Sequence, residues 1–367
     1  MSVFPIITIF SIYLISSCRG LSNYTIYFAF MRRSKQSYFV DTSLRIVVTF
    51  FYVFIPLALI GCDAEDSFEI SNNSEESTSW ITPELERSVP DWALSDYLEI
   101  EKVELYMSHQ GISVNLQGGD VYNDFYFQFQ DKNANLYVYD VKEKSLAYAI
   151  SMEAESINHC NNASFSRIFY EEGDEYPLIY VSNSNTPSYN HVQVYRITSI
   201  KGSLGVEKVQ EIVLPEANET NNLFATDVIM DNYNGYMYVA SKGIVIEDEI
   251  GRLIKFRIPD PHNKVVCLTE ADILDSFKMP FFRCRQGATI VGNKMFFVAG
   301  VPHWGFNPEF LIIDLEKKVP IYIANLKDFG YNKEPESVFL YKGNIFISSN
   351  RTGIFKVSLT DEPLKQN

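Results

Sequence analysis

The sequence predicts an all-β protein, a single β-propeller with five blades. Its composition favours strands, because 23 Tyr and 27 Phe stand among 367 residues and aromatic side chains are enriched in β-sheets. A short apolar stretch also recurs five times along the chain, at spacings of 53, 58, 59 and 50 residues. A repeat of this length indicates a fold assembled from similar sheet units.

Each repeat contains the pattern of a four-stranded unit. The recurring strands begin at Asp124, Pro177, Gly235, Lys294 and Asn344. A second strand is expected at 135–141, 191–197, 252–258, 309–315 and 353–359, and a third at 145–150, 209–214 and 320–326. A strand-like stretch precedes each unit, from Gln117, His159, Ala225, Arg285 and Pro335. Four strands joined by hairpins form one propeller blade.

The two ends of the repeat region are expected to close the ring. The fifth unit stops at Leu359 without an outer strand, while the segment 97–108 has no hairpin partner of its own. Pairing the two would protect both sheet edges. We therefore expect a propeller over 95–362 and a short tail at 363–367. A six-bladed ring is the alternative, because the long units could hold another hairpin, and 198–207 is expected to be a long hairpin loop.

The N-terminal part has the features of a lipoprotein signal. A basic start at Met31-Arg32-Arg33-Ser34-Lys35 precedes the apolar run 46–60 and then Leu59-Ile60-Gly61-Cys62. This order resembles the lipobox of bacterial lipoproteins, which implies that residues 1–61 are a signal segment and Cys62 is lipidated. Met31 is an alternative start. Cys18 follows a similar stretch and competes with Cys62, and a plain transmembrane anchor is a further alternative.

The segment 62–94 is acidic and poor in apolar residues, so it is expected to be a flexible tether. Its acids resemble the surface-export signal of lipoproteins in the Bacteroidetes. The expected location is the cell envelope, lipid-anchored in the outer membrane, with exposure at the surface as one alternative. From residue 62 onward, 26 basic residues face 45 acidic ones, a net charge of −19, which argues against nucleic acid as a partner. No CxxC pair is present, so a zinc site of that type is not expected.

Polar residues stand at the same place in every repeat, just where each innermost strand is expected to begin. Innermost strands line the channel of a propeller, so these side chains are expected to meet at one mouth. The candidate ligand-binding residues are Gln117, His159, Asn161, Asp227, Arg285, Gln286 and Glu336, together with Trp304 in the loop 300–309. Each has a structural alternative. His159 and Asp227 could fix turns, Arg285 could pair with Glu334 or Glu336, and Trp304 could pack on a neighbouring blade. Gly118, Gly119 and Gly287 are expected to let backbones pass closely.

Two motifs resemble those of known propellers. Gln286-Gly287-Ala288 and Glu334-Pro335-Glu336-Ser337 resemble the QGA and EPE motifs of TolB-like, teichoic-acid-biosynthesis-type and glutaminyl-cyclase-like propellers. The stretches 117–141 and 159–182 look more like uncharacterised β-propeller lipoproteins of gut Bacteroidetes. That resemblance covers most of 95–360 and carries no established activity. Ser337 replaces the glycine usual after EPE.

Three functions are compatible with this pattern. The first is binding of a small polar or glycan ligand at the channel mouth. The second is a carboxylate-dependent glycan hydrolase or lyase, in which Asp227, Glu334 and Glu336 are the candidate acids and His159 the candidate base or metal ligand, with calcium as a candidate cofactor. The third is a protein-interaction scaffold, which large apolar side chains plugging the channel would favour. No GxSxG or HExxH motif supports serine-hydrolase or zincin chemistry.

Overall fold

The computed structural model describes residues 89–109, 111–131, 135–152, 159–183, 191–200, 202–215, 227–241, 250–280 and 284–362. All of them belong to one compact unit, Asn73–Asn367. Cys62, the predicted signal segment and the predicted tail lie outside the described residues, as does most of the predicted tether. The lipobox prediction therefore stays a prediction.

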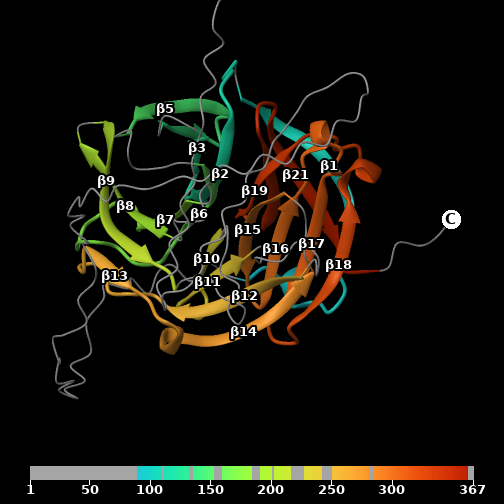
Figure 1. The fold of residues 1–367 in the computed structure, drawn as a ribbon. Coiled ribbons are helices and arrows are strands. Elements are labelled where there is room, and N and C mark those ends of the chain that lie inside the picture. The colour runs from blue at the N-terminus through green and yellow to red at the C-terminus, as the bar shows by residue number, and fades with distance from the viewer. Residues whose placement is uncertain are drawn as a thin grey trace, which may run out of the picture. The chain divides into compact units, whose positions relative to one another are not determined.

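Five separate sheets make up the described part (Figure 1). From the inner to the outer strand, the first is β2 (Leu116–Tyr122), β3 (Phe125–Gln130), β4 (Asn135–Asp140) and β5 (Ser145–Ser151), and the second is β6 (Cys160–Phe165), β7 (Ile179–Asn183), β8 (His191–Ile200) and β9 (Ser203–Val213). The third is β10 (Asp227–Asp231), β11 (Tyr236–Ser241), β12 (Ile250–Arg257) and β14 (Ile273–Pro280), and the fourth is β15 (Arg285–Val291), β16 (Lys294–Ala299), β17 (Glu309–Asp314) and β18 (Val319–Asn325). The fifth is β19 (Pro335–Tyr341), β20 (Asn344–Ser349), β21 (Gly353–Thr360) and β1 (Glu99–Ser108).

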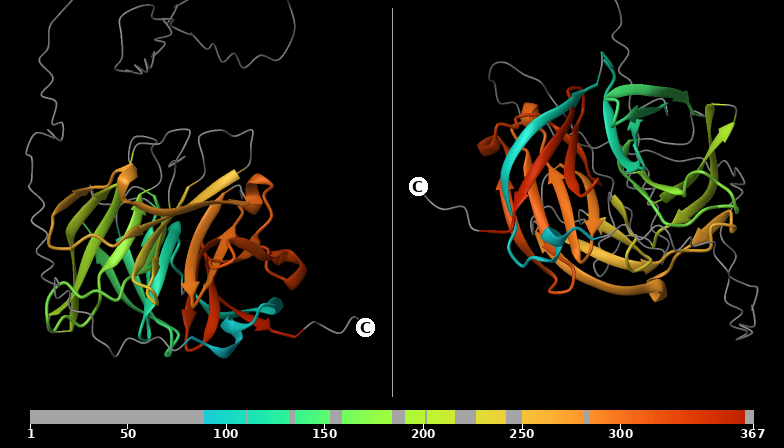
Figure 2. Two further views of the ribbon diagram at one scale, coloured as in Figure 1. Left: turned by 90° about the horizontal axis from the view of Figure 1, so that it is seen from below. Right: turned by 180° about the vertical axis from the view of Figure 1, so that it is seen from behind.

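The five inner strands form a closed ring. β2 packs against β6, β6 against β10, β10 against β15, β15 against β19, and β19 against β2. Seen from the side, the blades stand next to one another around this ring (Figure 2). The fold is therefore a five-bladed β-propeller, as the sequence predicts, and the six-bladed alternative is not formed.

The ring is closed by a strand from the beginning of the propeller. β1 pairs antiparallel with β21, with Val103 opposite Val357 and Glu99 opposite Thr360. The closing strand predicted at 97–108 is confirmed. Because β1 and β21 lie at opposite ends of the propeller sequence, their pairing joins the two ends through backbone hydrogen bonds.

Two local expectations differ from the structure. The segment 198–207 is not a long loop, because β8 runs to Ile200 and β9 starts at Ser203, and the two pair along their length. Leu204 and Val206 pack on the core between the first two blades, and this packing stabilises the extension of the hairpin over 198–207. A further strand, β13 (Val265–Cys267), is not predicted from the sequence. It has three residues, pairs in parallel with β9 and so ties the third blade to the second.

The hydrophobic core is divided into five layers, one between each pair of neighbouring blades. Aromatic rings bridge the blades in several layers. Phe127 meets Phe165 edge-on at 5.1 Å between the first and second blades, and Tyr126 stacks on Phe339 at 4.4 Å between the first and fifth. Each fully buried side chain of this size contributes about 1.5–3 kcal/mol. This packing explains why the central strands of each repeat are apolar on both faces.

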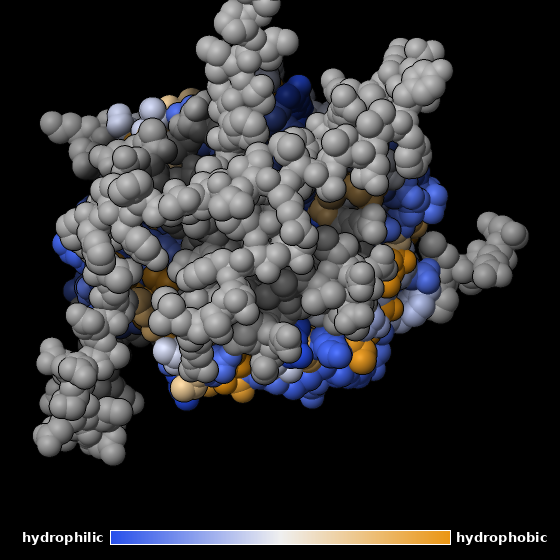
Figure 3. Space-filling model, in the orientation of Figure 1, coloured by the Kyte–Doolittle hydropathy of each residue, from blue (hydrophilic) through white to orange (hydrophobic). Residues whose placement is uncertain are grey.

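Helical structure in the described part is limited to short 3-10 turns: η2 (Asp91–Leu94), η4 (Glu270–Asp272), η5 (Pro302–Trp304) and η6 (Leu326–Phe329). None of the described helices has the length and apolarity needed to cross a membrane. On the face seen in Figure 3, the described residues at the rim are mainly hydrophilic, with small separate hydrophobic areas.

Candidate functional site

Four of the five inner strands share a backbone irregularity near their starts, whereas β10 pairs with β11 in a continuous register. The pairing register shifts between Leu116 and Gly119, Cys160 and Ala163, Arg285 and Gly287, and Pro335 and Ser337. An extra residue at such a bulge re-aims the local side chains. The shifted residues include Gln117, Asn161, Gln286 and Glu336, which are four of the predicted site residues. The equivalence that the sequence predicts between the blades is thus present in the backbone of four of the five.

Two glycines let neighbouring inner strands approach closely at these bulges. A Cβ on Gly118 would lie 2.6 Å from the Cα of Asn162, and a Cβ on Gly287 would lie 2.5 Å from the Cα of Ser337. Real Cβ atoms do not approach backbone atoms this closely, so a side chain at either position would push two blades apart. The structural alternative expected for these glycines is confirmed.

Asp227 and Arg285 form a buried ion pair at the centre of the ring. They are 0% and 2% exposed, and the Arg285 Nε donates to an Asp227 carboxylate oxygen. The guanidinium also donates to the Ala240 carbonyl at 2.7 Å and to the Ser241 carbonyl at 3.2 Å. Asn161 donates to Asp227 and to the Arg285 carbonyl at 2.9 Å. Arg285 therefore pairs with Asp227 rather than with Glu334 or Glu336.

Asn162 extends this central network to further strands. Its side-chain amide donates to the Val228 carbonyl at 2.6 Å and to the Ala288 carbonyl at 3.2 Å, and its oxygen accepts from the Ala288 N–H. One side chain from the second blade thus binds the backbones of the third and fourth. The polar side chains of this network are hydrogen-bonded to one another or to backbone groups, and the contacts of Asp227, Arg285, Asn161 and Asn162 hold the second, third and fourth blades together.

A chain of backbone hydrogen bonds joins the loops at one mouth of the channel. The Asn350 N–H donates to the Glu334 carbonyl, and the Leu116 N–H donates to the Asn350 carbonyl, each at 3.2 Å. The chain continues where the Asp131 N–H donates to the Asn115 carbonyl at 2.9 Å and the His159 N–H to the Asp131 carbonyl at 3.1 Å. These bonds link the fifth, first and second blades. They therefore fix the backbone positions from which the side chains at this mouth extend.

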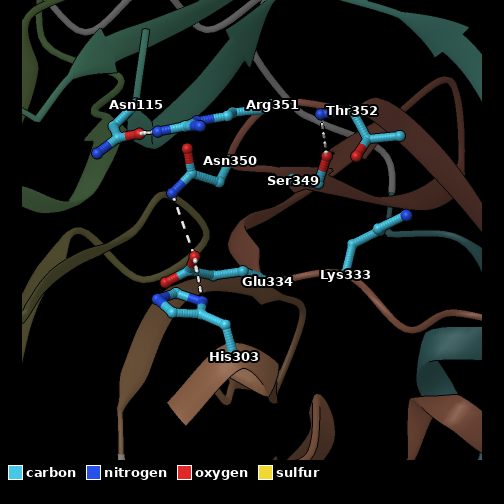
Figure 4. A pocket seen from close by; sticks show the side chains of 8 residues that line it. All are labelled: Asn115, His303, Lys333, Glu334, Ser349, Asn350, Arg351 and Thr352. Atoms are coloured by element: carbon cyan, nitrogen blue, oxygen red, sulfur yellow. Dashed lines mark hydrogen bonds and ion pairs between the residues drawn. The ribbon is translucent and has the colours of Figure 1, made fainter. Parts of the chain in front are cut away.

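A hollow of about 420 Å³ opens at this mouth. It is lined by Asn115, His303, Lys333, Glu334, Ser349, Asn350, Arg351 and Thr352. Figure 4 shows the side chains of Asn350, Glu334 and His303 in a row, with Glu334 in contact with the other two. The Asn350 amide donates to Glu334 at 3.2 Å, and the His303 Nδ1 lies 3.7 Å from the same carboxylate oxygen. Arg351 crosses the far side of the hollow and donates to the Asn115 side chain at 2.9 Å.

The two glutamates of the EPE motif have different surroundings. Glu334 lines the hollow, and burial raises the pKa of its carboxyl, against the opposing effect of His303, Asn350 and nearby cationic groups. Glu336 is fully buried, and neither carboxyl oxygen has a hydrogen-bond partner within the described part. Burial raises the pKa of Glu336 well above its ordinary value, the charge of Glu334 raises it further, and the Asn350 side chain beside it opposes the rise. Of the three candidate acids, Glu334 borders the hollow, whereas Asp227 and Glu336 lie inside the protein.

The remaining predicted residues lie at different depths. His159 has a positive φ of 67°, and its Nδ1 lies 2.6 Å from an Asp131 carboxylate oxygen, so it fixes the turn into β6. Gln286 donates to Glu334 at 3.3 Å beside the hollow. Gln117 is buried. Trp304 is 67% exposed and meets His303 edge-on at 5.4 Å, so it does not pack on a neighbouring blade.

Several residues at the mouth were missed by the sequence reasoning. These are Asn115, Asp131, Lys333, Asn350 and Arg351. They stand in the loops just before the inner strands or just after the second strand of a blade. In a hairpin-built blade these two kinds of loop lie at the same end, so the topology could have indicated them.

Comparison with known proteins adds little to this geometry. No protein family matches the chain, and no curated protein does either. Among solved structures, it is similar to a glutaminyl cyclase of Myxococcus xanthus, with a TM-score of 0.43, 8% identity and coverage of 71% of this chain and 96% of that one. A GH43 β-1,3-galactosidase gives a TM-score of 0.42 and 13% identity, covering 71% of this chain and 60% of that one.

A Bacteroides thetaiotaomicron protein of unknown function gives a TM-score of 0.37 and 9% identity, covering 72% of this chain and 77% of that one. The identities of all three are too low to indicate a shared activity. The assignment of this chain to the five-bladed β-propellers therefore rests on its own strand order and ring closure.

Proposed function

We propose that the protein binds a small polar ligand, a glycan in class, in the hollow at the channel mouth. The observation that carries the proposal is the composition of the hollow, because all eight residues that line it are polar or charged. A volume of about 420 Å³ is within the usual range for small-molecule sites. Convergent amides, hydroxyls, a carboxylate and a guanidinium are the groups that recognise sugar hydroxyls.

The charges at the hollow favour a saccharide that carries an acidic group. Lys333 and Arg351 bring two cations to the hollow in a chain whose net charge is −15. Arg351 presents a planar guanidinium that suits a carboxylate. The exposed indole of Trp304, next to His303, offers an apolar surface for the face of a sugar ring.

The cellular location belongs to the same proposal and is supported by the sequence alone. A lipidated Cys62 followed by an acidic tether would hold the propeller at the outer membrane of the cell envelope, where glycans are accessible. The resemblance to propeller lipoproteins of gut Bacteroidetes supports this setting.

Titration calorimetry on the purified full chain tests the binding proposal, after a glycan array has chosen the best oligosaccharide. We expect uronic-acid oligosaccharides to bind more tightly than neutral ones of the same length. Lys333→Ala and Arg351→Ala should each weaken binding roughly tenfold, which corresponds to about 1.4 kcal/mol. Lys318→Ala is the matched control, because this exposed lysine lies on the outer side of the fourth blade.

Two results would contradict the proposal. One is an array without any bound glycan, and the other is an unchanged affinity in both cationic variants. Loss of binding in Lys318→Ala to the same degree would show that the effect is one of overall charge and not of the hollow.

A further inference from the structure

Among the eight residues that line the hollow, Glu334 alone has a carboxyl group. Its side chain is 15% exposed and lies between His303 and Asn350 (Figure 4). An acidic saccharide in the hollow would bring a second carboxylate close to this one. Two carboxylates at one site repel each other, and proteins relieve the repulsion by keeping a proton on one of them.

The contacts of Glu334 differ from those of a carboxylate that is held as an anion. The Asn350 amide donates to one carboxyl oxygen at 3.2 Å, and the Gln286 amide donates to the other at 3.3 Å. Both distances are long, because hydrogen bonds to an ionised carboxylate are typically about 2.7–2.9 Å. No lysine or arginine among the described residues forms an ion pair with Glu334, and His303 Nδ1 stands 3.7 Å away. The carboxyl is therefore free to change its protonation state without losing a strong ion pair.

Several charged or titratable groups surround Glu334. They are His303 in η5, His159 with its partner Asp131 at the turn into β6, Lys333 just before Glu334, Arg351 after β20, and the buried Glu336 in β19. Burial raises the pKa of the Glu334 carboxyl, and the nearby cationic groups oppose this rise without cancelling it. The carboxyl therefore keeps its proton to a higher pH than an ordinary glutamate does.

We propose that Glu334 binds the acidic group of the saccharide as a neutral carboxylic acid, so that the hollow takes up one proton together with each ligand. The proton then lies between the Glu334 carboxyl and the ligand carboxylate, in a charge-assisted O–H···O hydrogen bond. The pair carries one negative charge, which Lys333 and Arg351 balance from the same hollow. The inference rests on the proposed function, because it assigns how that site selects an acidic saccharide.

Binding should therefore be tighter in mildly acidic solution. The ligand carboxylate raises the pKa of Glu334 further in the complex. Above the pKa of the free Glu334 carboxyl, the complex must take its proton from solution, so each pH unit weakens binding by up to about tenfold. Below that pKa the proton is already in place, and the affinity levels off.

Titration calorimetry of the full chain with a uronic-acid oligosaccharide, in buffers of different ionisation enthalpy, counts the protons directly. Between about pH 5 and pH 8, we expect uptake to rise to about one proton per ligand while the affinity falls. The methyl ester of the same oligosaccharide has no carboxylate to share a proton and should bind without uptake. This measurement uses the wild-type protein, so it does not depend on the folding of a variant.

Three variants assign the proton to a side chain. Glu334→Gln keeps the shape of the side chain and is always neutral, so it should bind without proton uptake and more tightly than the wild type near pH 8. His303→Gln should retain the uptake. Glu309→Gln is the matched control, because burial also raises the pKa of Glu309, which does not line the hollow.

The outcomes separate this inference from the proposed function. An acidic oligosaccharide that binds without proton uptake, and equally well across the pH range, overturns the inference and leaves the proposed function in place. Failure of every acidic saccharide to bind overturns both. Uptake that persists in Glu334→Gln, or that disappears in His303→Gln, assigns the proton to another group and also overturns the inference.

Discussion

At the scale of single residues, Asp227 and Arg285 show that a polar residue at the propeller axis can stabilise the fold by joining two blades. Both stand at positions where sequence reasoning expects ligand contacts. In the structure, their charges neutralise each other and the other donors of Arg285 bind backbone carbonyls of β11. A buried charge without its partner is strongly unfavourable. These two side chains therefore act first as a clamp between the third and fourth blades.

The clamp can be tested with Asp227→Asn. This change leaves Arg285 charged and buried without its counter-ion, so the free energy of unfolding should fall by about 3–5 kcal/mol. The double variant Asp227→Asn with Arg285→Gln removes both charges and should lose less than the sum of the single variants. Denaturant unfolding followed by tyrosine and tryptophan fluorescence measures all three. If Asp227→Asn unfolded like the wild type, the clamp would be refuted.

At the scale of elements, the closing strand β1 is followed directly by a buried histidine. His109 follows Ser108, is 1% exposed, and stacks on Tyr139 of the first blade at 5.2 Å. Neither ring nitrogen has a hydrogen-bond partner in the described part of the chain. Burial lowers the pKa of His109 to about 4. The neutral ring is therefore part of the contact that joins the closing strand to the first blade.

This histidine should make the stability of the ring sensitive to acid. The unfolded chain takes up a proton near pH 6.5, whereas the folded chain does not until about pH 4. The stabilisation is therefore complete above pH 6.5 and is lost as the pH falls toward 4, by about 3 kcal/mol. His109→Phe keeps the ring and removes the titration, so its unfolding free energy should depend less on pH between 7.5 and 4.5.

The control for this experiment is His262→Gln, which changes an exposed histidine. Equilibrium unfolding at a series of pH values gives the slope for each protein. Identical slopes for the wild type and His109→Phe would show that another group governs the acid response.

At the scale of the whole molecule, the fold was predictable and the site was only partly so. The repeat of apolar strands indicated five blades, and the unpaired segment 97–108 indicated how the ring closes. Both follow from the need of every blade to bury both faces and of the ring to have no free edge.

The site was harder to predict because the position of a residue in the repeat does not show whether its side chain holds the blades together or lines the hollow. Gln286 and Glu336 occupy the same kind of bulge, yet the first reaches Glu334 beside the hollow and the second is fully buried. Which of them faces the hollow depends on side-chain packing and on loops such as 349–352, whose lengths differ from blade to blade. A short strand such as β13 also escapes prediction, since its pairing with β9 comes from a different repeat.

A crystal structure of the full chain with its best acidic oligosaccharide would test the central claim most directly. The claim is that the loops of the fourth, fifth and first blades form one ligand site at the mouth of the ring. We predict density for the saccharide in the hollow, in contact with Arg351, Glu334 and Asn350. Density for the saccharide on the outer strands or at the opposite mouth, with the hollow free of it, would contradict the claim.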